Sequence, residues 1–144
     1  MSNFELEEGA TLCLDFGKLE KYFQERGDGK TQIVPVVVQD INSKEVLILA
    51  YANEETLYYS LKNRIAAFWS TSRNEFWIKG STSGSILTLI EVRVNCEQNS
   101  LLYLVRPVNN CGACHTKANG RYRKSCYYRR ITVRNNKYRL RRIT

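Results

Sequence analysis

The sequence predicts a single α+β domain built on a mostly antiparallel, twisted sheet with one or two helices. Three observations carry this prediction: a β-branched apolar run at residues 33–38, a capped helical segment after residue 53, and apolar residues with a period of two between residues 66 and 107. A chain of 144 residues is about one ordinary domain long, and 43% hydrophobic with 25% charged residues is typical of globular proteins.

The first 30 residues form an acidic segment that we expect to be an N-terminal extension. Large apolar residues recur in it at helical spacing, at Leu12, Phe16, Leu19 and Phe23. This spacing predicts a helix over residues 12–23.

The main domain is expected to span residues 31–133. Residues 33–38 predict a buried strand, and residues 45–51 predict a second strand after a turn at 40–44. Asn53 is followed by two glutamates, a pattern typical of a helix N-cap, and the helix is expected to run to about Lys62.

The second half of the chain predicts strands joined by short turns. They are expected at 66–72, 76–80, 85–95 and 100–107, followed by an irregular loop at 108–126 that is rich in cysteine and glycine. Strands at 127–133 and 138–143 flank Asn135-Asn136, which predicts a hairpin that ends in a basic C-terminal strand within residues 134–144.

Charge is distributed unevenly along the chain. The last 28 residues hold 11 of the 22 basic residues and none of the 14 acidic ones. This excess predicts a phosphate-bearing partner, either a small nucleotide or a nucleic acid, although a solvated basic tail would give the same pattern. No apolar run approaches the roughly 20 residues that a membrane span needs, and the N-terminus does not resemble a signal peptide. We therefore expect a cytoplasmic protein that does not associate with membranes.

Five cysteines in such a chain indicate metal binding or catalysis rather than disulfides. Two interpretations stay open. Three cysteine ligands would leave a position for water, whose proton a neighbouring histidine could take. Alternatively, a closed structural zinc site could use four sulfurs, from Cys96, Cys111, Cys114 and Cys126.

Five segments of the sequence resemble the phosphoribosyl-AMP cyclohydrolase family in order and spacing, over roughly residues 32–130. These enzymes of histidine biosynthesis hydrolyse the N1–C6 bond of the purine. The segments are Gln39-Asp40 with Glu45–Glu55, Phe68-Trp-Ser-Thr-Ser-Arg73, Trp77-Ile-Lys-Gly-Ser-Thr-Ser-Gly84, Ala113-Cys-His-Thr116 and Ser125-Cys126.

The resemblance implies a zinc-dependent hydrolase that opens the cyclic amidine of phosphoribosyl-AMP or a related adenine nucleotide. It further implies a homodimer with Zn²⁺ at the interface, held by cysteines of both subunits that correspond to Cys96, Cys114 and Cys126. His115 is then the candidate general base and acts on a water that the zinc activates.

Several residues in the resembling segments suit a purine nucleotide. Hydroxyl, backbone and cationic groups can hold its phosphate, and a tryptophan can stack on its base. The tryptophans could equally be packing residues of the sheet, and the cations could lie on a solvated strand face. The candidate substrate-binding residues are Trp69, Ser70, Ser72, Arg73, Lys79, Thr82, Ser83 and Gly84.

The sequence departs from the family pattern around Cys96. Where the family has Asp-Cys-Asp-x-Asp, whose carboxylates hold magnesium, this chain has Asn95-Cys-Glu-Gln-Asn99. Because Mg²⁺ prefers charged oxygen ligands, we expect its site to be weakened or lost. Glu97 could hold a residual ion or be simply a turn residue.

Two further departures are Thr71 in place of an arginine and a basic insert at residues 117–124. We therefore expect a divergent member of the family. It could act on another purine nucleotide, or it could be a non-catalytic module that binds zinc or nucleic acid. Nucleic acid is the less favoured partner.

Overall fold

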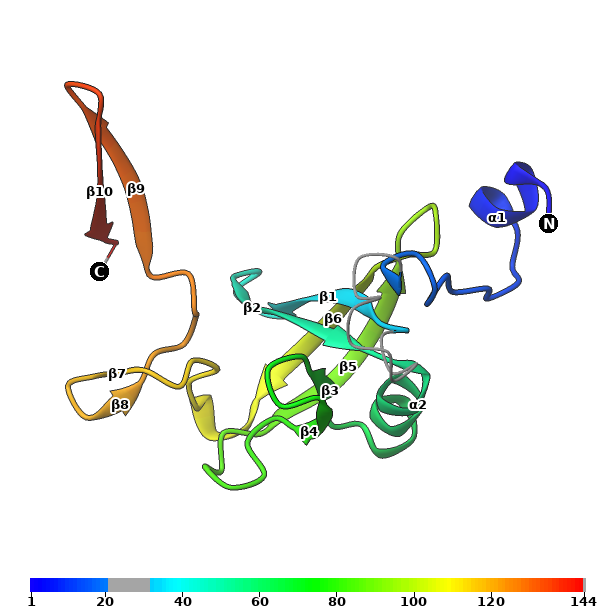
Figure 1. The fold of residues 1–144 in the computed structure, drawn as a ribbon. Helices are drawn as coiled ribbons and strands as arrows, with labels where there is room; N and C mark the ends of the chain where they lie inside the picture. The colour runs from blue at the N-terminus through cyan, green and yellow to red at the C-terminus, as the bar shows by residue number, and fades with distance from the viewer. Residues whose placement is uncertain (21–31, 144) are drawn as a thin grey trace.

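The fold is built on a four-stranded sheet with the order β2-β1-β6-β5 (Figure 1). The computed structural model describes residues 1–20 and 32–143. The β1–β2 and β5–β6 pairs are antiparallel, whereas β1 and β6 run parallel in the middle of the sheet. The predicted α+β fold with a mostly antiparallel sheet is confirmed. The four strands are β1 (Val34–Asp40), β2 (Val46–Ala52), β5 (Leu87–Val94) and β6 (Leu101–Pro107).

A short hairpin extends the sheet beside β5. It consists of β3 (Ala67–Ser70) and β4 (Glu75–Ile78). The residues before β3 attach it to β5, because Ala66 donates its backbone N–H to the carbonyl of Leu87 at 3.0 Å. This attachment brings the end of β4 to the same edge of the fold as the start of β5.

The helix α2 (Glu54–Asn63) begins as the sequence predicts. Asn53 caps it, accepting from the Thr56 N–H at 2.9 Å, while the Thr56 hydroxyl accepts from the Asn53 N–H at 3.0 Å. The buried Ser60 hydroxyl accepts from the backbone N–H of Ala67 at 2.9 Å. A polar side chain therefore fixes the helix to β3 with its hydrogen-bonding capacity satisfied.

The helix predicted over residues 12–23 is wrong where the structure describes it, and Phe23 lies outside the described residues. The α-helix of the described N-terminal segment is instead α1 (Asn3–Glu8). Leu14 and Phe16 pack against the core, which is a period of two rather than of a helix. Asp15 donates its backbone N–H to the carbonyl of Gln98 at 2.8 Å. In this segment a backbone hydrogen bond to a distant part of the chain takes the place of the hydrogen bonds of a helix.

The C-terminal third contains two hairpins. The one predicted around Asn135-Asn136 is confirmed, since β9 (Arg129–Arg134) pairs with β10 (Lys137–Arg142) and both asparagines have positive φ. The other was not predicted: β7 (Lys117–Ala118) and β8 (Arg121–Tyr122) form a small hairpin within the expected irregular loop.

The missed signal for this second hairpin is Asn119-Gly120, a dipeptide that favours a two-residue turn. Both of its residues have positive φ, at 53° and 75°. A 3₁₀ turn at Val108–Asn110 precedes it. The predicted domain boundaries at residues 30 and 133 stay predictions.

The two faces of the sheet differ in burial. One face carries the core, with Val36, Val38 and Tyr103 fully buried. The other, which we call the open face, presents apolar residues that remain partly exposed: Val37, Val46, Leu49 and Leu102. Among the described residues, no helix has the length and apolarity needed to cross a membrane.

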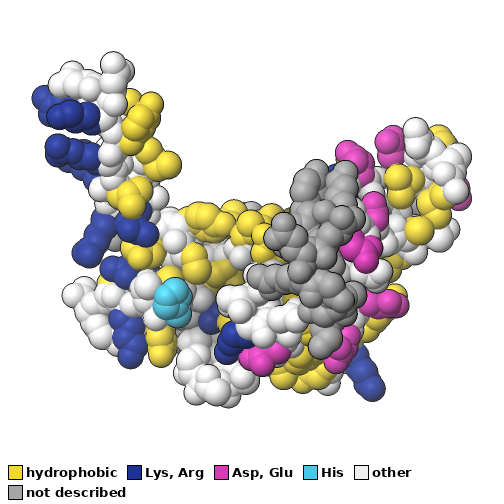
Figure 2. Space-filling view, in the orientation of Figure 1, with side chains coloured by type: hydrophobic (Ala, Val, Ile, Leu, Met, Phe, Trp, Pro, Cys, Tyr) yellow, Lys and Arg dark blue, Asp and Glu magenta, His cyan; other side chains and the backbone are white. Residues whose placement is uncertain are grey.

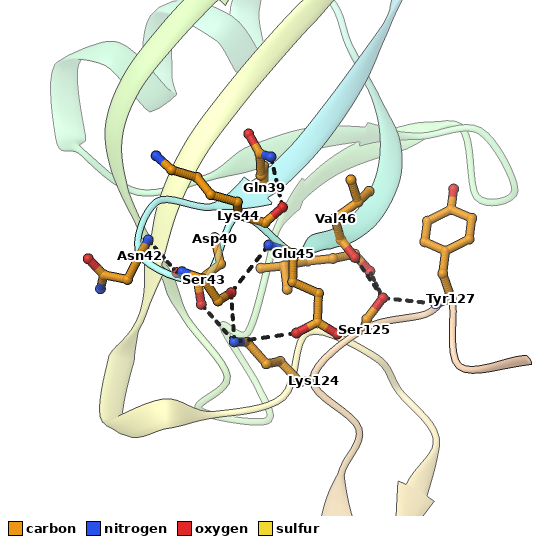
Figure 3. A network of polar contacts seen from close by, with 11 residues as sticks. Gln39, Asp40, Asn42, Ser43, Lys44, Glu45, Val46, Lys124, Ser125 and Tyr127 are labelled. Carbon is orange, nitrogen blue, oxygen red and sulfur yellow. Dashed lines mark hydrogen bonds and ion pairs between the residues drawn. The ribbon is translucent and has the colours of Figure 1, made fainter. Parts of the chain in front are cut away.

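The segment 124–126 is fastened to the turn between β1 and β2 (Figure 3). Lys124 Nζ lies 3.0 Å from Asp40 Oδ2 and 3.4 Å from Glu45 Oε2. The Ser125 hydroxyl donates to the Val46 carbonyl at 2.7 Å, and the Cys126 N–H donates to the carbonyl of Leu47 at 2.8 Å. This anchor, formed by Lys124, Ser125 and Cys126, sets the position of the chain that follows.

Asp40 is the buried partner in this anchor. Burial opposes its ionisation, but the backbone N–H groups of Asn42 and Ser43, together with Lys124, outweigh that effect and hold the pKa of the carboxyl below its usual 3.8. Because the folded pKa is depressed, the ionised carboxylate stabilises the fold above the pKa of the unfolded chain. That stabilisation is lost as the pH falls through the folded pKa.

We expect Asp40→Asn to lower the free energy of unfolding by about 1 kcal/mol at pH 7, because the amide keeps the turn bonds but loses the charge that faces Lys124. The difference from wild type should shrink as the pH falls below 4. Urea unfolding at pH 7 and pH 3 measures both effects. Glu45→Gln removes the exposed partner and serves as the control with a smaller loss. An equal loss for both variants would contradict the assignment to Asp40.

Candidate metal and nucleotide site

Cys114 and Cys126 form a pair of hydrogen-bonded thiols at the end of the sheet where β2 begins. Cys114 is buried, and its Sγ lies 2.9 Å from the Thr116 hydroxyl oxygen and 3.4 Å from the Thr116 backbone nitrogen. Arg123 donates to the same hydroxyl at 3.0 Å. The Cys114 sulfur therefore has both the hydroxyl and the backbone N–H of Thr116 as polar neighbours.

The two thiols have opposite pKa shifts. Burial would raise the pKa of Cys114, but hydrogen bonds from Thr116 and Cys126 and the charge of Arg123 hold it below the ordinary value. Cys126 is exposed as a residue, yet the groups crowded around its sulfur desolvate the thiolate. This desolvation and the neighbouring Cys114 raise the pKa of Cys126 to about 11. Of the two sulfurs, Cys114 therefore ionises more readily than Cys126.

Lys79 lies among three thiols. It is buried just beyond the end of β4, and burial lowers its pKa, while negative charge on Cys111, Cys126 and Cys114 opposes that shift. Cys111 donates its S–H to the carbonyl of Ile86 at 3.5 Å. An ammonium group therefore stands beside sulfurs that would otherwise repel one another when ionised.

The loop that carries Cys114 is packed tightly against the basic insert. Cys114 donates its N–H to the carbonyl of Arg123 at 3.0 Å, and Arg123 returns one to Thr116 at 2.9 Å. A Cβ on Gly112 would lie 2.2 Å from the carbonyl oxygen of Tyr122, so no other residue fits without displacing the backbone. The insert at 117–124 is thus part of the framework that holds the sulfur.

Cys96 lies at the opposite end of the sheet. It follows β5, whereas Cys111 contacts Ile86, the residue before β5 begins. Eight strand residues rise by roughly 27 Å in an antiparallel sheet. Within the described residues of one chain, no three His, Cys, Asp or Glu side chains are placed to hold a metal ion. The structure therefore brings together Cys114 and Cys126 but not Cys96, and a closed four-cysteine site inside one chain is excluded.

The donor set fits zinc as part of a shared site. Two thiols in contact are ligands that zinc prefers, and a cation bound to both would displace their protons. The described part of one chain supplies no further ligand to this pair. Any additional protein ligand from these residues would have to come from a second copy.

The candidate nucleotide residues fall into two turns joined by Trp77. The first turn, between β3 and β4, contains Ser70, Ser72 and Arg73, and the Ser70 and Ser72 hydroxyls lie 3.3 Å apart. The second, after β4, contains the exposed residues Thr82, Ser83 and Gly84. The Trp77 ring centroid lies 6.0 Å from Arg73 Cζ and 5.9 Å from Lys79 Nζ.

The tryptophans are largely packing residues in this structure. The Trp77 ring lies 5.8 Å from the Phe68 ring at an angle of 46°, against the core. Trp69 is half-buried opposite Phe76 in the β3–β4 pair. Arg73 also forms an ion pair with Glu75 at 3.3 Å, so a phosphate would have to compete for it.

The segment around Cys96 is organised as a capped turn. The Asn95 side-chain oxygen accepts from the backbone N–H groups of Asn99 and Ser100 at 2.8 and 2.9 Å. Glu97 accepts from the Asn99 amide at 3.3 Å and lies 4.0 Å from Lys18 Nζ. These contacts favour a turn role for Glu97 over a role in binding magnesium.

Gln98 is a structurally important residue that no pattern in the sequence indicated. It is buried and accepts from the Cys13 N–H at 2.6 Å, while its amide donates to the carbonyls of Leu6 and Thr11 at 3.2 and 3.0 Å. The N-terminal segment is thereby tied to the Cys96 end of the sheet.

A family model described as phosphoribosyl-AMP cyclohydrolase matches residues 48–128, which include the thiol pair, Cys96 and both turns. The chain belongs to the phosphoribosyl-AMP cyclohydrolase family. Relatives with this name include one from Archaeoglobus fulgidus, 46% identical over 78% of this chain and 94% of the relative. Another, from Caulobacter vibrioides, is 38% identical over 89% of this chain and 80% of the relative.

In this cyclohydrolase family member, His115 is the residue next to the buried Cys114. It is exposed, and as the chain's single histidine it is visible in cyan in Figure 2. The two neighbouring residues of this motif therefore differ in burial: Cys114 is buried and His115 is exposed. The Cys114 side chain is buried against Thr116 and Cys126, while the His115 imidazole remains accessible to solvent.

We expect Gly112→Ala to expose the Cys114 sulfur, because the added methyl group cannot coexist with the Tyr122 carbonyl. The rate of Cys114 modification by a thiol-specific chromogenic reagent should rise at least tenfold, as expected for a site that opens about 1.4 kcal/mol more easily. Gly120→Ala is the control: its Cβ meets nothing within 4 Å, so only its positive φ is strained. Equal rates for the two variants would contradict the packing argument.

Proposed function

We propose that this protein hydrolyses the N1–C6 bond of phosphoribosyl-AMP, in the manner of histidine biosynthesis, at a zinc site shared by two copies of the chain. The observation that carries this proposal is the contact between Cys114 and Cys126, two thiols of the kind that zinc prefers, with the pKa of Cys114 lowered by Thr116, Cys126 and Arg123. The names and the coverage of the relatives support the choice of substrate.

The proposed ligands are Cys114 and Cys126 of one copy and Cys96 of the second. When bound, zinc would supply Lewis-acid chemistry that makes water a nucleophile at neutral pH. The Thr116 hydroxyl accepts a hydrogen bond from Arg123 and contacts the Cys114 sulfur, and so orients that sulfur. Lys79 lowers the electrostatic cost of gathering thiolates.

The open face of the sheet supports a second copy as the source of Cys96. Val37, Val46 and Leu49 are 37, 40 and 50% exposed there. Two such faces could stack about a two-fold axis perpendicular to the strands, at the usual spacing of roughly 10 Å. That symmetry reverses the strand direction, so the Cys96 end of one copy would overlie the thiol pair of the other. Each dimer would then contain two sites.

The reaction adds one water across the N1–C6 bond. The water oxygen forms the new bond to C6 and the N1–C6 bond breaks. One water proton goes to N1 and the other to the exocyclic nitrogen, so that C6 becomes the carbon of a carboxamide. His115 is accessible beside Cys114 and is the group proposed to take a proton from the water and return it to N1. A single imidazole can perform both transfers because it regains its initial state.

The phosphate-binding role is proposed for the two turns around Trp77. Lys79 and Arg73 supply positive charge close to the ring, and the hydroxyls and backbone of residues 82–84 supply donors. The contact between Glu97 and Lys18 places a cation where a magnesium ion would otherwise be attracted. Phosphate neutralisation by protein cations is therefore the proposed substitute for magnesium.

The shared site predicts that two inactive variants rescue each other. Cys96→Ser and Cys114→Ser should each lose bound zinc and turnover. A mixture of the two, unfolded and refolded together, should recover about a quarter of wild-type activity, because half of the dimers are mixed and each mixed dimer has one intact site of two. Absorbance during phosphoribosyl-AMP turnover and metal analysis give the two readouts.

The control for this experiment is Cys111→Ser, which removes a thiol that is close to Lys79 but is not a proposed ligand. It should keep one zinc per chain and its activity. Failure of the mixture to recover activity would contradict the shared site. Zinc-loaded wild-type protein that leaves phosphoribosyl-AMP intact, with and without magnesium, would contradict the substrate and favour another purine nucleotide.

His115→Ala should lower kcat by about 10²- to 10⁴-fold, the usual contribution of a general acid–base group, while zinc content and nucleotide binding stay at wild-type levels. The dependence of kcat on pH separates this role from a structural one. If His115 is the base, the decrease of kcat at acidic pH that its protonation causes should be absent from the variant. A variant that loses zinc together with activity would instead make His115 a ligand.

A further inference from the structure

The hairpin β9–β10 has one apolar and one basic face. Its cross-strand pairs Leu140–Ile131 and Tyr138–Val133 place four apolar side chains on the same face. Their exposed fractions are 59, 72, 74 and 63%. The opposite face consists of Arg130, Thr132, Arg134, Lys137, Arg139 and Arg141.

This apolar face is uncovered within the described part of the chain. The hairpin projects from the end of the molecule beyond β7 and β8 (Figure 1). A two-stranded ribbon is at best marginally stable in water, and apolar residues that gather on a surface mark a contact with another molecule. The hairpin begins directly after the last residue that the family model matches.

A complementary surface lies at the opposite end of the molecule. Residues 3–15, which we call the N-terminal arm, contain Glu5, Glu7 and Glu8 and also Phe4 and Leu12, which are 74 and 54% exposed. Gln98 ties the arm beside Cys96. Figure 2 shows acidic side chains at the arm's end of the molecule and basic side chains at the hairpin's end.

We propose that the hairpin is a clasp that binds the N-terminal arm of a second copy of this chain. The clasp rests on the proposed function, because the two-fold symmetry that brings Cys96 to the partner's thiol pair also brings each arm to the partner's hairpin. The hairpin starts three residues after the anchored Cys126, and the arm is fixed next to Cys96. Within one chain the hairpin follows the thiol-pair end of the sheet, whereas the arm lies at the Cys96 end.

The chemistry of the two surfaces matches. Arg142 and Arg129 lie at the base of the hairpin on its apolar face, in register with each other. In the described part of the chain, no hairpin lysine or arginine is ion-paired with a carboxylate, and neither is any glutamate of the arm. Apolar contact between Ile131, Leu140 and the arm would supply affinity, and the opposite charges would set the orientation.

The first test compares the two faces of the hairpin in the full chain. Ile131→Ser with Leu140→Ser should raise the dimer dissociation constant at least about tenfold, whereas Arg130→Ser with Arg139→Ser on the other face should change it less than about threefold. Sedimentation velocity over a concentration series, with and without a zinc chelator, gives these constants. The effect should persist in the chelated protein, because the clasp contains no metal ligand.

The second test reverses charge and does not depend on the stability of the apolar variant. Arg142→Glu alone, and Glu7→Lys with Glu8→Lys alone, should each weaken the dimer, and combining the three substitutions in one chain should restore it. Restoration supports the contact between arm and hairpin. Additive weakening overturns it.

An unchanged dimer in the Ile131/Leu140 variant also overturns the clasp. Salt-sensitive RNA binding that is lost only in the Arg130/Arg139 variant would then assign the ribbon to nucleic acid. The proposed function can fail separately: a protein without zinc or turnover whose dimer still depends on Ile131 and Leu140 retains the clasp. A protein that loses the clasp but recovers activity in the cysteine mixture retains the shared site.

Discussion

The anchor of residues 124–126 on the start of β2 is the constraint on which the rest of this structure depends. The lysine is held by a buried carboxylate, the serine hydroxyl by a strand carbonyl, and the Cys126 amide by the next carbonyl. These contacts determine where the Cys126 sulfur meets Cys114 and where the C-terminal hairpin leaves the body. Loss of the anchor would therefore disturb the site and the hairpin together.

Charge and chemistry are distributed between the two ends of one sheet. One end holds the thiol pair, Lys79 and the basic insert, and the other holds Cys96, Gln98 and the acidic arm. A sheet of this length keeps both ends apart within a chain, so the groups cannot satisfy one another there. The proposed self-association would join them, because a two-fold axis would match each end with its complement.

Much of the fold could be predicted because its signals are local. The Asn53 cap, the period-two strands and the Asn135-Asn136 turn depend on residues close in sequence, and the structure contains all three. The prediction of an N-terminal helix was wrong because Leu14 and Phe16 pack against the core. Asp15 bonds to Gln98, a partner more than eighty residues away in the sequence. The β7–β8 hairpin was missed although Asn119-Gly120 signalled it, since the surrounding cysteines suggested only an irregular metal loop.

The sequence by itself determined the family, the residue types of the candidate site and the separation of charge, because motifs and composition are properties of the chain alone. Only the tertiary structure decided that Cys114 and Cys126 are hydrogen-bonded neighbours while Cys96 lies a strand length away, since sequence spacing does not measure distance in space. It also decided that the basic insert packs against the loop of Cys114 and that the apolar face of the hairpin is left uncovered by the rest of the described chain. Both outcomes depend on strand register, which pairs residues across the sheet and so assigns each side chain to a face.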